Sequence, residues 1–283
     1  MAADAEKRPA GSRPLTLLFA LFVLFLYGPI VAVLLLSFQG PDGGLTFPMR
    51  SVSLHWFADL FRPQPIGDIW GGFWRSIKLG FLVMALTVVI SFLAGLAYRR
   101  PFRGSTALFY IVIASLIMPS IVVSLGIGAM FELLGGPRGW YTSGLGAHLT
   151  WTLPFGLLIM FAVFNRFNPA YEEAARDLGA SGWQTVRLVV LPIVGPSLIG
   201  VALFGFTLSF DEIARTSQAI GSSNTLPLEL QAMQTNVTTP VIYALGALTT
   251  GISLAVIGTS FGLMALLRMR RRRHGSDAGK GMV

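Results

Sequence analysis

Six long stretches of this 283-residue chain contain no charged side chain. Each is 20 to 38 residues long, and they cover residues 14–41, 79–98, 104–131, 139–165, 188–210 and 230–267. About 20 apolar residues in an α-helix cross the hydrocarbon layer of a membrane, which is roughly 30 Å thick. Charged residues make up only 12% of the chain, against roughly 25% in an average soluble protein. The sequence therefore predicts an all-α, polytopic membrane protein with six transmembrane helices.

The basic side chains are distributed unevenly between the two sides of such a bundle. If the N-terminus is cytoplasmic, 15 of the 21 Lys and Arg residues fall on the cytoplasmic side. The others are Arg50, Arg62, Arg75, Lys78, Arg138 and Arg215. Because cytoplasmic segments of membrane proteins are enriched in Lys and Arg, both termini are expected in the cytoplasm. Anchoring at lipid headgroups then accounts for the net charge of +8, and no nucleic-acid partner is expected.

The predicted organisation is one membrane domain between two short tails. Residues 1–13 form a cytoplasmic tail, 14–267 the six-helix domain and 268–283 a basic cytoplasmic tail. Over residues 54–61, apolar side chains at helical spacing predict either a short helix in the membrane interface or aromatic rings that pack under the loop. Four of the predicted transmembrane helices contain a proline, at Pro29, Pro119 (in a third helix over 107–134), Pro154 and Pro196. Because proline removes a helical hydrogen bond, kinks are expected in these spans.

The cytoplasmic segment 166–192, between the fourth and fifth predicted helices, has the sequence of a structured element. Asn168 is placed to cap a helix whose first residue is Pro169, where a missing N–H costs nothing. Apolar residues from Ala170 to Leu178 then recur on one helical face. On the polar face, Glu172 and Arg176 can pair at a spacing of four residues.

A second helix is expected after this one. Gly179 stands where the end of a helix needs a left-handed residue. Ser181 and Gln184 form a capping box that opens the next helix, which is expected to run towards Val190 and to stop before Pro192. The segment is therefore predicted to project from the membrane as two helices joined at a glycine turn, a plausible contact for a soluble partner.

The spacing within this segment resembles a known motif. Glu173-Ala174-Ala175, Gly179, Val189 and Leu191-Pro192 follow the pattern E-A-A-x3-G-x9-I-x-L-P, with valine in place of isoleucine. This is similar to the EAA loop of binding-protein-dependent ABC importer permeases. The segments Phe206–Glu212 and Leu226–Leu228 resemble the spermidine/putrescine-type permease subunits in particular, as does the hydropathy over nearly all of residues 15–267.

The resemblance implies the type I ABC importer permease core and a set of partners in a bacterial inner membrane. These are two copies of an ATP-binding cassette subunit, a second permease subunit that is a different chain, an extracytoplasmic solute-binding protein and membrane lipid. It also implies that the EAA loop couples to the ATPase through Glu173, Ala174, Ala175 and Gly179, with Leu191 and Pro192 closing the motif. The chain has no G-x4-G-K-[ST] phosphate loop, so ATP and Mg²⁺ are expected on the partner and the chain is not expected to be an enzyme.

Two adjacent carboxylates, Asp211 and Glu212, follow the fifth predicted helix at its outer end. Ionisable residues close to membrane spans often mark function, and this pair would attract a cationic solute. The resemblance places acidic residues here in polyamine permeases, which makes a polyamine the first candidate solute. The alternative is that both are hydrated loop carboxylates paired with Arg215, which would weaken the attraction. Opines, amino-acid derivatives and phosphonates therefore remain open as solutes.

Other interpretations fit the sequence less well. A secondary transporter or channel is expected to carry charges near mid-membrane, and these are scarce here. Residues Gly258 to Gly262 match the G-x-S-x-G pattern of serine hydrolases, but they lie in an apolar predicted helix rather than at a strand-to-helix turn. The chain has no cysteine and its three histidines, among them a His148 expected to be solvated, are scattered, so no metal site is expected.

Overall fold

The computed structural model describes residues 12–63, 67–99, 102–236 and 239–277. Most of the predicted N-terminal tail and the end of the C-terminal tail, including Lys280, therefore lie outside the described residues. The chain divides into two compact units, residues 1–65 with 233–251 and residues 66–232 with 252–283, which are described separately. Across the described residues the regular structure is helical, apart from one antiparallel bridge between Gln39 and Val52.

The first unit contains α1 (Ser12–Leu36), α2 (His55–Asp59) and the beginning of α12 (Val241–Asp277). The short α2 falls within the helix expected over 54–61. The ring of Phe57 in α2 lies 5.3 Å from that of Phe38, which precedes the loop leading to α2. Tyr243 of α12 donates a hydrogen bond through Oη to the carbonyl of Leu45, at 2.7 Å, which fastens this loop to the start of α12.

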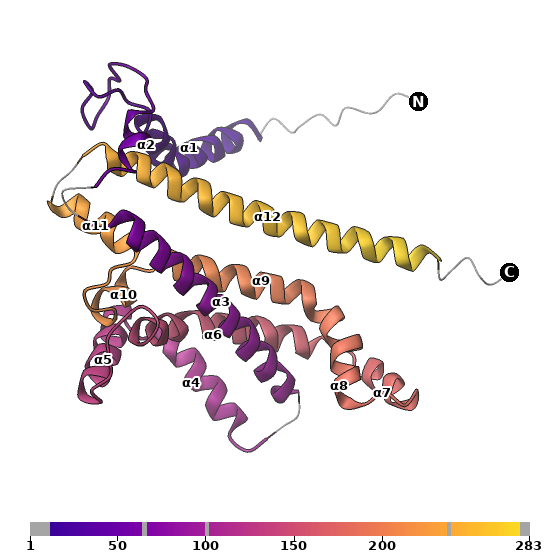
Figure 1. Ribbon diagram of the computed structural model, residues 1–283. Coiled ribbons are helices and arrows are strands. Elements are labelled where there is room, and N and C mark those ends of the chain that lie inside the picture. Colours follow the sequence, from indigo (N-terminus) through magenta and orange to yellow (C-terminus); the bar gives the residue numbers. More distant parts are fainter. Residues whose placement is uncertain (1–11, 64–66, 100–101, 237–238, 278–283) are drawn as a thin grey trace, which may run out of the picture. The chain divides into compact units, whose positions relative to one another are not determined.

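The second unit is built around three long helices, α3 (Ile69–Tyr98), α6 (Ser143–Asn165) and α9 (Leu191–Phe210), which pack against one another in all three pairs (Figure 1). The remaining elements are α4 (Ser105–Ile117), α5 (Ser120–Leu133), α7 (Ala170–Asp177), α8 (Gly182–Thr185), a π turn (Val186–Val190), α10 (Ala214–Ala219), α11 (Leu226–Asn236) and the rest of α12. The helices α7 and α8 lie at one end of α9, and α10 follows its other end.

Small residues allow the three long helices to approach closely. A Cβ on Gly156 of α6 would lie 2.3 Å from the Oγ of Ser91 in α3 and 3.2 Å from Val201 in α9. Beside it, the hydroxyls of Thr87 and Thr152 are 2.8 Å apart and bridge α3 and α6. Close packing of this kind, with hydrogen bonds between helices, is how membrane helices associate when both neighbours and lipid are apolar.

Among the described residues, five helices are long and apolar enough to cross a membrane: residues 14–36, 69–98, 143–165, 182–210 and 241–262. A sixth span is formed only if α4 and α5 count together, and these two helices are bent by 107°. The six predicted spans are thus all found, but the third is not the straight helix expected over 107–134. Met118 and Pro119 have extended backbones with ψ of 132° and 127°, because a residue before proline is driven out of the helical region.

The other prolines do not interrupt their helices. Pro29, Pro154 and Pro196 all lie inside continuous helices. Of the four prolines, only Pro119 interrupts its span. The second predicted span, by contrast, starts earlier than hydropathy indicated. Asp68 accepts a hydrogen bond from the backbone N–H of Gly71 at 2.8 Å, and this N-cap extends α3 to Ile69.

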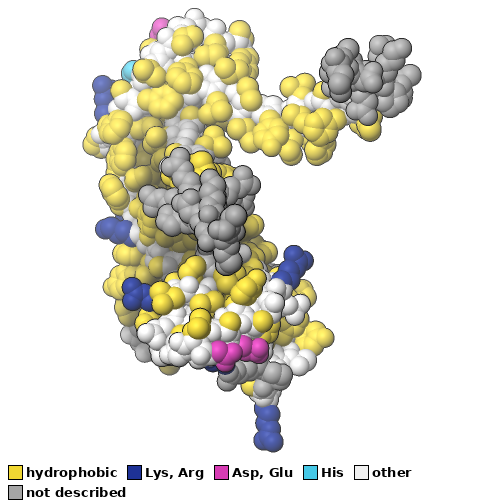
Figure 2. Space-filling model, turned by 90° about the vertical axis from the view of Figure 1, so that its right-hand side faces the viewer, with side chains coloured by type: hydrophobic (Ala, Val, Ile, Leu, Met, Phe, Trp, Pro, Cys, Tyr) yellow, Lys and Arg dark blue, Asp and Glu magenta, His cyan; other side chains and the backbone are white. Residues whose placement is uncertain are grey.

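The surface of the molecule is apolar over wide areas (Figure 2). Hydrophobic side chains cover most of the described part of the face shown, and basic ones are isolated. On α1, for example, Phe25 is 80% exposed and Leu15 68% exposed. Exposed apolar area on this scale is a liability in water and is expected where helices face lipid or another membrane subunit.

In α12, Ser260 bonds the carbonyl of Val256 within the helix, so there is no nucleophile elbow there.

Candidate functional site

The segment after α6 folds into the two helices that its sequence predicts. The backbone N–H of Ala170 donates to Oδ1 of Asn168 at 3.0 Å, so Asn168 caps α7 as expected. At the other end, Gly179 has a φ of +85°, in the left-handed region. The N–H groups of Gly179 and Ala180 donate to the carbonyls of Arg176 and Ala175, the two bonds of a Schellman motif.

The second helix begins as predicted but does not end where expected. Ser181 and Gln184 form the capping box, with each side chain bonded to the backbone N–H of the other. Instead of stopping before Pro192, the chain passes through the π turn directly into α9. The N–H of Leu191 bonds the carbonyl of Val186, one residue farther back than in an α-helix. This wider turn gives room for the proline ring, which would clash with a carbonyl four residues earlier in a regular helix.

The outward surface of this segment carries the residues of the EAA motif. Glu173, Ala174 and Gly179 are exposed, Ala175 is half-buried, and Leu191 and Pro192 are exposed at the start of α9. Large apolar side chains surround them: Leu178 is 89% exposed and Trp183 71%. A surface that combines exposed aromatic and aliphatic side chains with a carboxylate has the composition of a protein interface.

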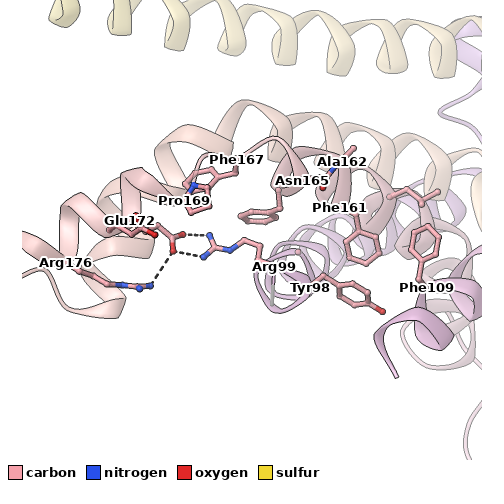
Figure 3. Close-up of a pocket in the computed structure, with 14 residues that line it drawn as sticks. Tyr98, Arg99, Phe109, Phe161, Ala162, Asn165, Phe167, Pro169, Glu172 and Arg176 are labelled. Atoms are coloured by element: carbon pink, nitrogen blue, oxygen red, sulfur yellow. Dashed lines mark hydrogen bonds and ion pairs between the residues drawn. The ribbon is translucent and has the colours of Figure 1, made fainter. Parts of the chain in front are cut away.

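Glu172 is buried, whereas its neighbour Glu173 is exposed. Its carboxylate forms an ion pair with both Nη atoms of Arg99, which directly follows α3, and the Nη2–Oε2 distance is 2.6 Å (Figure 3). Arg176 reaches the same carboxylate from the other side, at 3.4 Å, as the spacing of four residues predicts. The pairing with Arg99 was not predicted, because the partners are 73 residues apart in sequence and no local pattern connects them.

Beside this ion pair lies a pocket of about 870 Å³. Its wall includes Tyr98, Phe109 and Phe161 at one side and Arg99 and Glu172 at the other. The rings of Tyr98 and Phe161 are 4.3 Å apart, and the guanidinium of Arg99 lies over the rings of Phe164 and Phe167 at 5.4 and 5.5 Å. The attachment of α7 to the end of the bundle is therefore made by side chains around an open space rather than by a filled apolar interface.

Asp211 and Glu212 lie at the far end of α9 from this pocket. The residue Asp211 is exposed, although the surrounding chain removes part of the hydration of its carboxylate, and this desolvation raises its pKa. Glu212 accepts a hydrogen bond through Oε1 from the backbone N–H of Arg215 at 2.8 Å. Asp211 and Glu212 thus lie side by side along the backbone after α9, and Glu212 also fixes the first turn of α10.

An ion pair between these carboxylates and the Arg215 side chain, the alternative considered from the sequence, is not found. Arg215 is fully buried, and its guanidinium donates to the hydroxyls of Ser120 at 3.3 Å and Thr150 at 3.1 Å. It also lies 4.6 Å from the centroid of the Trp151 ring. Burial lowers the pKa of Arg215, and the nearby negative charge of Glu212 opposes this effect. The guanidinium is directed towards Ser120 and Thr150, so the alternative in which it pairs with the two carboxylates is not the arrangement found.

His148 was expected to be solvated and is instead buried. Its Nδ1 lies 2.8 Å from the hydroxyl of Ser209, and its Nε2 lies 2.9 Å from that of Thr216. It therefore joins α6 to α9 and α10. Nothing in the sequence around His148 indicates these contacts, because both partners come from elements more than 60 residues away. No group of three or more His, Asp or Glu side chains that could hold a metal occurs in the described part of the chain.

Comparison with known proteins decides the family. Residues 87–274 match the family model described as "Binding-protein-dependent transport system inner membrane component". The chain belongs to this family. The family indicated by the EAA motif is thereby confirmed, and the protein is a non-catalytic membrane permease component of the ABC importer type.

Among similar proteins, spermidine/putrescine transport system permease protein PotC of Haemophilus influenzae is 30% identical to this permease over 252 residues, which are 88% of this chain and 94% of the relative. Putrescine transport system permease protein PotI of Escherichia coli (strain K12) is 26% identical over 267 residues, 91% of this chain and 92% of the relative. The family resemblance thus extends over nearly the whole permease.

Solved structures share the fold at lower sequence identity. A bacterial ABC transporter that imports the acidic polysaccharide alginate has a chain that is 16% identical, with a TM-score of 0.63 over 96% of this permease and 99% of that chain. The MetNI methionine ABC transporter, in an inward-facing conformation, has a chain that is 17% identical, with a TM-score of 0.56 over 70% of this permease and 95% of that chain. The predicted all-α permease fold is confirmed.

Proposed function

We propose that this permease couples ATP hydrolysis by a cytoplasmic ATP-binding cassette subunit to alternating access of a solute path. The observation that carries the proposal is the exposed two-helix segment of α7 and α8, rigidly connected to α9. In this mechanism Glu173, Ala174, Ala175 and Gly179 contact the ATPase, and Leu191 and Pro192 join that contact to α9. Movement of packed helices as rigid bodies would then carry closure of the ATPase to the membrane.

The remaining parts of the importer belong to other chains. ATP and Mg²⁺ bind to two copies of the ATPase, a different permease chain completes the pore, and an extracytoplasmic protein delivers the solute. Both termini of this chain lie in the cytoplasm. A solved structure of a related alginate transporter in complex with a periplasmic protein supports the assignment of such a partner, and the distribution of Lys and Arg supports the orientation.

The proposed solute is a polyamine or a similar small cation. Two observations support it: the relatives PotC and PotI are named as spermidine/putrescine and putrescine permeases, and Asp211 and Glu212 lie together at the end of α9 away from α7. With Arg215 turned into the protein, no basic side chain of α10 is directed at the pair, so their field can attract a cation.

The docking surface is tested by substitutions that change it without touching the core. Glu173→Lys reverses an exposed charge. Gly179→Trp adds a bulky side chain at a position with a left-handed backbone. A residue with a Cβ is strained in this conformation, at a cost of roughly 1–2 kcal/mol. In complexes reconstituted with ATPase, second permease and binding protein, the two changes together are expected to lower uptake of labelled spermidine by about tenfold or more, and to reduce co-purification of the ATPase.

Asp177→Asn on the same helix is the control, and it should behave like the unmodified chain. Unchanged co-purification and uptake in the Glu173→Lys, Gly179→Trp protein would disprove the docking role. Uptake of a neutral or anionic solute in place of spermidine would disprove the polyamine assignment and leave the coupling mechanism intact.

A further inference from the structure

The two neighbouring glutamates of α7 lie in opposite environments, which suggests different roles. Glu173 is exposed, whereas Glu172 is only 6% exposed and is engaged by two arginines. A buried carboxylate cannot contact a docked protein without giving up its partners. Glu172 is therefore unavailable to the ATPase, although it lies directly beside the docking motif.

Arg99 is held firmly on the other side of this ion pair. Its side chain is 22% exposed, and its guanidinium lies over the rings of Phe164 and Phe167 while both Nη atoms bond the carboxylate. Bidentate arginine–carboxylate pairs fix orientation as well as distance. Stacking on two aromatic rings limits the guanidinium further. The contact is thus stiff in direction, unlike a solvated surface pair.

This ion pair connects elements that otherwise have little direct packing. The helix α7 packs against α8 and the π turn, and the pocket of about 870 Å³ separates much of α7 from the end of the bundle. Arg99 follows α3, and α3 packs along both α6 and α9. A displacement of α7 can therefore reach α3 by three routes: along the chain through residues 166–169 into α6, along the chain through the π turn into α9, or directly through Arg99 and Glu172.

We propose that Arg99 and Glu172 form a mechanical link that moves α3 together with α7, so that displacement of the docking segment acts directly on α3 as well as on α6 and α9, to which α7 is joined along the chain. Both are positioning residues rather than docking residues. The inference rests on the proposed function, because it takes the driving displacement to come from the ATPase. Without the link, α7 would act on α6 and α9 along the chain, and α3 would receive the motion only through its packing against those two helices.

The test separates transport from hydrolysis in the reconstituted importer. Glu172→Gln and Arg99→Met each remove one charge of the link. Both variants are expected to retain the ATPase subunits and to hydrolyse ATP, while uptake of labelled spermidine per ATP hydrolysed falls about three- to thirty-fold. The exchanged pair Arg99→Glu with Glu172→Arg should recover a substantial part of this ratio. If the single variants failed only because they lost stability, the exchange would not restore it.

Asp177→Asn, an exposed change on the same helix, serves as the matched control and should leave the ratio unchanged. Arg99→Lys keeps the charge but loses the bidentate geometry, and it provides a milder variant if the others fail to give a homogeneous complex; its expected ratio lies between those of the unmodified protein and Arg99→Met. A normal ratio in Glu172→Gln or in Arg99→Lys would overturn the link. Loss of the ATPase from Glu172→Gln complexes would also overturn it, since Glu172 would then be a docking residue.

The two proposals can fail separately. If Glu173→Lys with Gly179→Trp keeps the ATPase bound, the docking surface has been misplaced, whatever the link variants do. If that protein loses the ATPase while the link variants transport normally, docking is correct and the link is wrong.

Discussion

At the scale of single residues, the chain separates carboxylates that look alike in the sequence. Glu172 and Glu173 are adjacent, yet one is buried in an ion pair and the other faces outward. The local half of this arrangement, Glu172 with Arg176, follows from helical spacing and was predicted. The half that buries Glu172 depends on where α3 ends relative to α7, which is a property of the three-dimensional packing.

Asp211 and Glu212 present the same lesson in another form. A spacing of three or four residues suggested that Arg215 would neutralise them, but α10 turns the arginine towards Ser120 and Thr150. Local spacing shows that an ion pair with the carboxylates is possible. It does not show that the folded protein also offers the arginine the hydroxyls of Ser120 and Thr150. The stacking on Trp151, which comes from α6, is available only in the folded bundle.

Neutralising both carboxylates should weaken uptake of a cation through loss of long-range attraction. The Asp211→Asn, Glu212→Gln protein is expected to take up spermidine about tenfold more slowly at low ionic strength. The difference should shrink as salt is raised, because attraction between exposed charges is screened. Initial uptake rates at two salt concentrations measure this effect.

Glu132→Gln is the matched control, since Glu132 is an exposed carboxylate with an arginine, Arg138, at 3.7 Å. It should leave both the rate and its salt dependence unchanged. An equal deficit for the Asp211, Glu212 variant at low and high salt would mean that the two residues act by a route other than electrostatic attraction.

At the scale of elements, prolines had three different outcomes that hydropathy alone does not distinguish. The helices α1, α6 and α9 continue through an internal proline, α4 and α5 are separated at Pro119, and Pro192 is accommodated by a π turn. Neighbouring packing and the backbone of the preceding residues decide which outcome is found. The caps at Asn168, Gly179 and Ser181 were predictable because their chemistry is local.

The π turn gives a physical reason for the proline that closes the EAA motif. One extra residue in a helical turn rotates the helix before it by about 100° relative to the helix after it. Replacing Pro192 with alanine removes the steric need for the wide turn, so the docking segment is expected to relax towards a rotated position. Uptake should fall by about two- to tenfold, as measured in the reconstituted importer.

Pro196→Ala is the control for this change, because Pro196 lies one turn farther along in the regular part of α9. Its uptake should stay near that of the unmodified chain. If Pro192→Ala transports as well as Pro196→Ala does, the orientation of the docking segment does not depend on the π turn.

At the scale of the whole molecule, the number of spans and the helical class were predictable from charge-free stretches, because burying a charge in lipid is costly at any position. The bend of 107° between α4 and α5 was not predictable from these stretches. The hydropathy of residues 104–131 is uniform, whereas the backbone changes direction at only two residues. The helices α7 and α8 lie at one end of the second unit and α10 at the other, because the long helix α9 connects them.

The orientation of these two ends across the membrane is open to a direct test, because the chain contains no cysteine. Single substitutions Leu178→Cys and Ser222→Cys place one thiol at each end, both at exposed positions. In intact cells a membrane-impermeant maleimide is expected to label Ser222→Cys and not Leu178→Cys. After permeabilisation both should react. Labelling of Leu178→Cys in intact cells would place the docking segment on the wrong side for an ATPase and contradict the proposed function.

The interlocking of α3, α6 and α9 around Gly156 limits where the permease can change shape. Helices that pack closely at a glycine and share a hydrogen bond between hydroxyls leave no free space in which one helix could slide along another. We therefore expect a change of shape within the second unit to occur along the borders of this three-helix block, where α4, α5 and α10 pack against α6, while the block moves as one body.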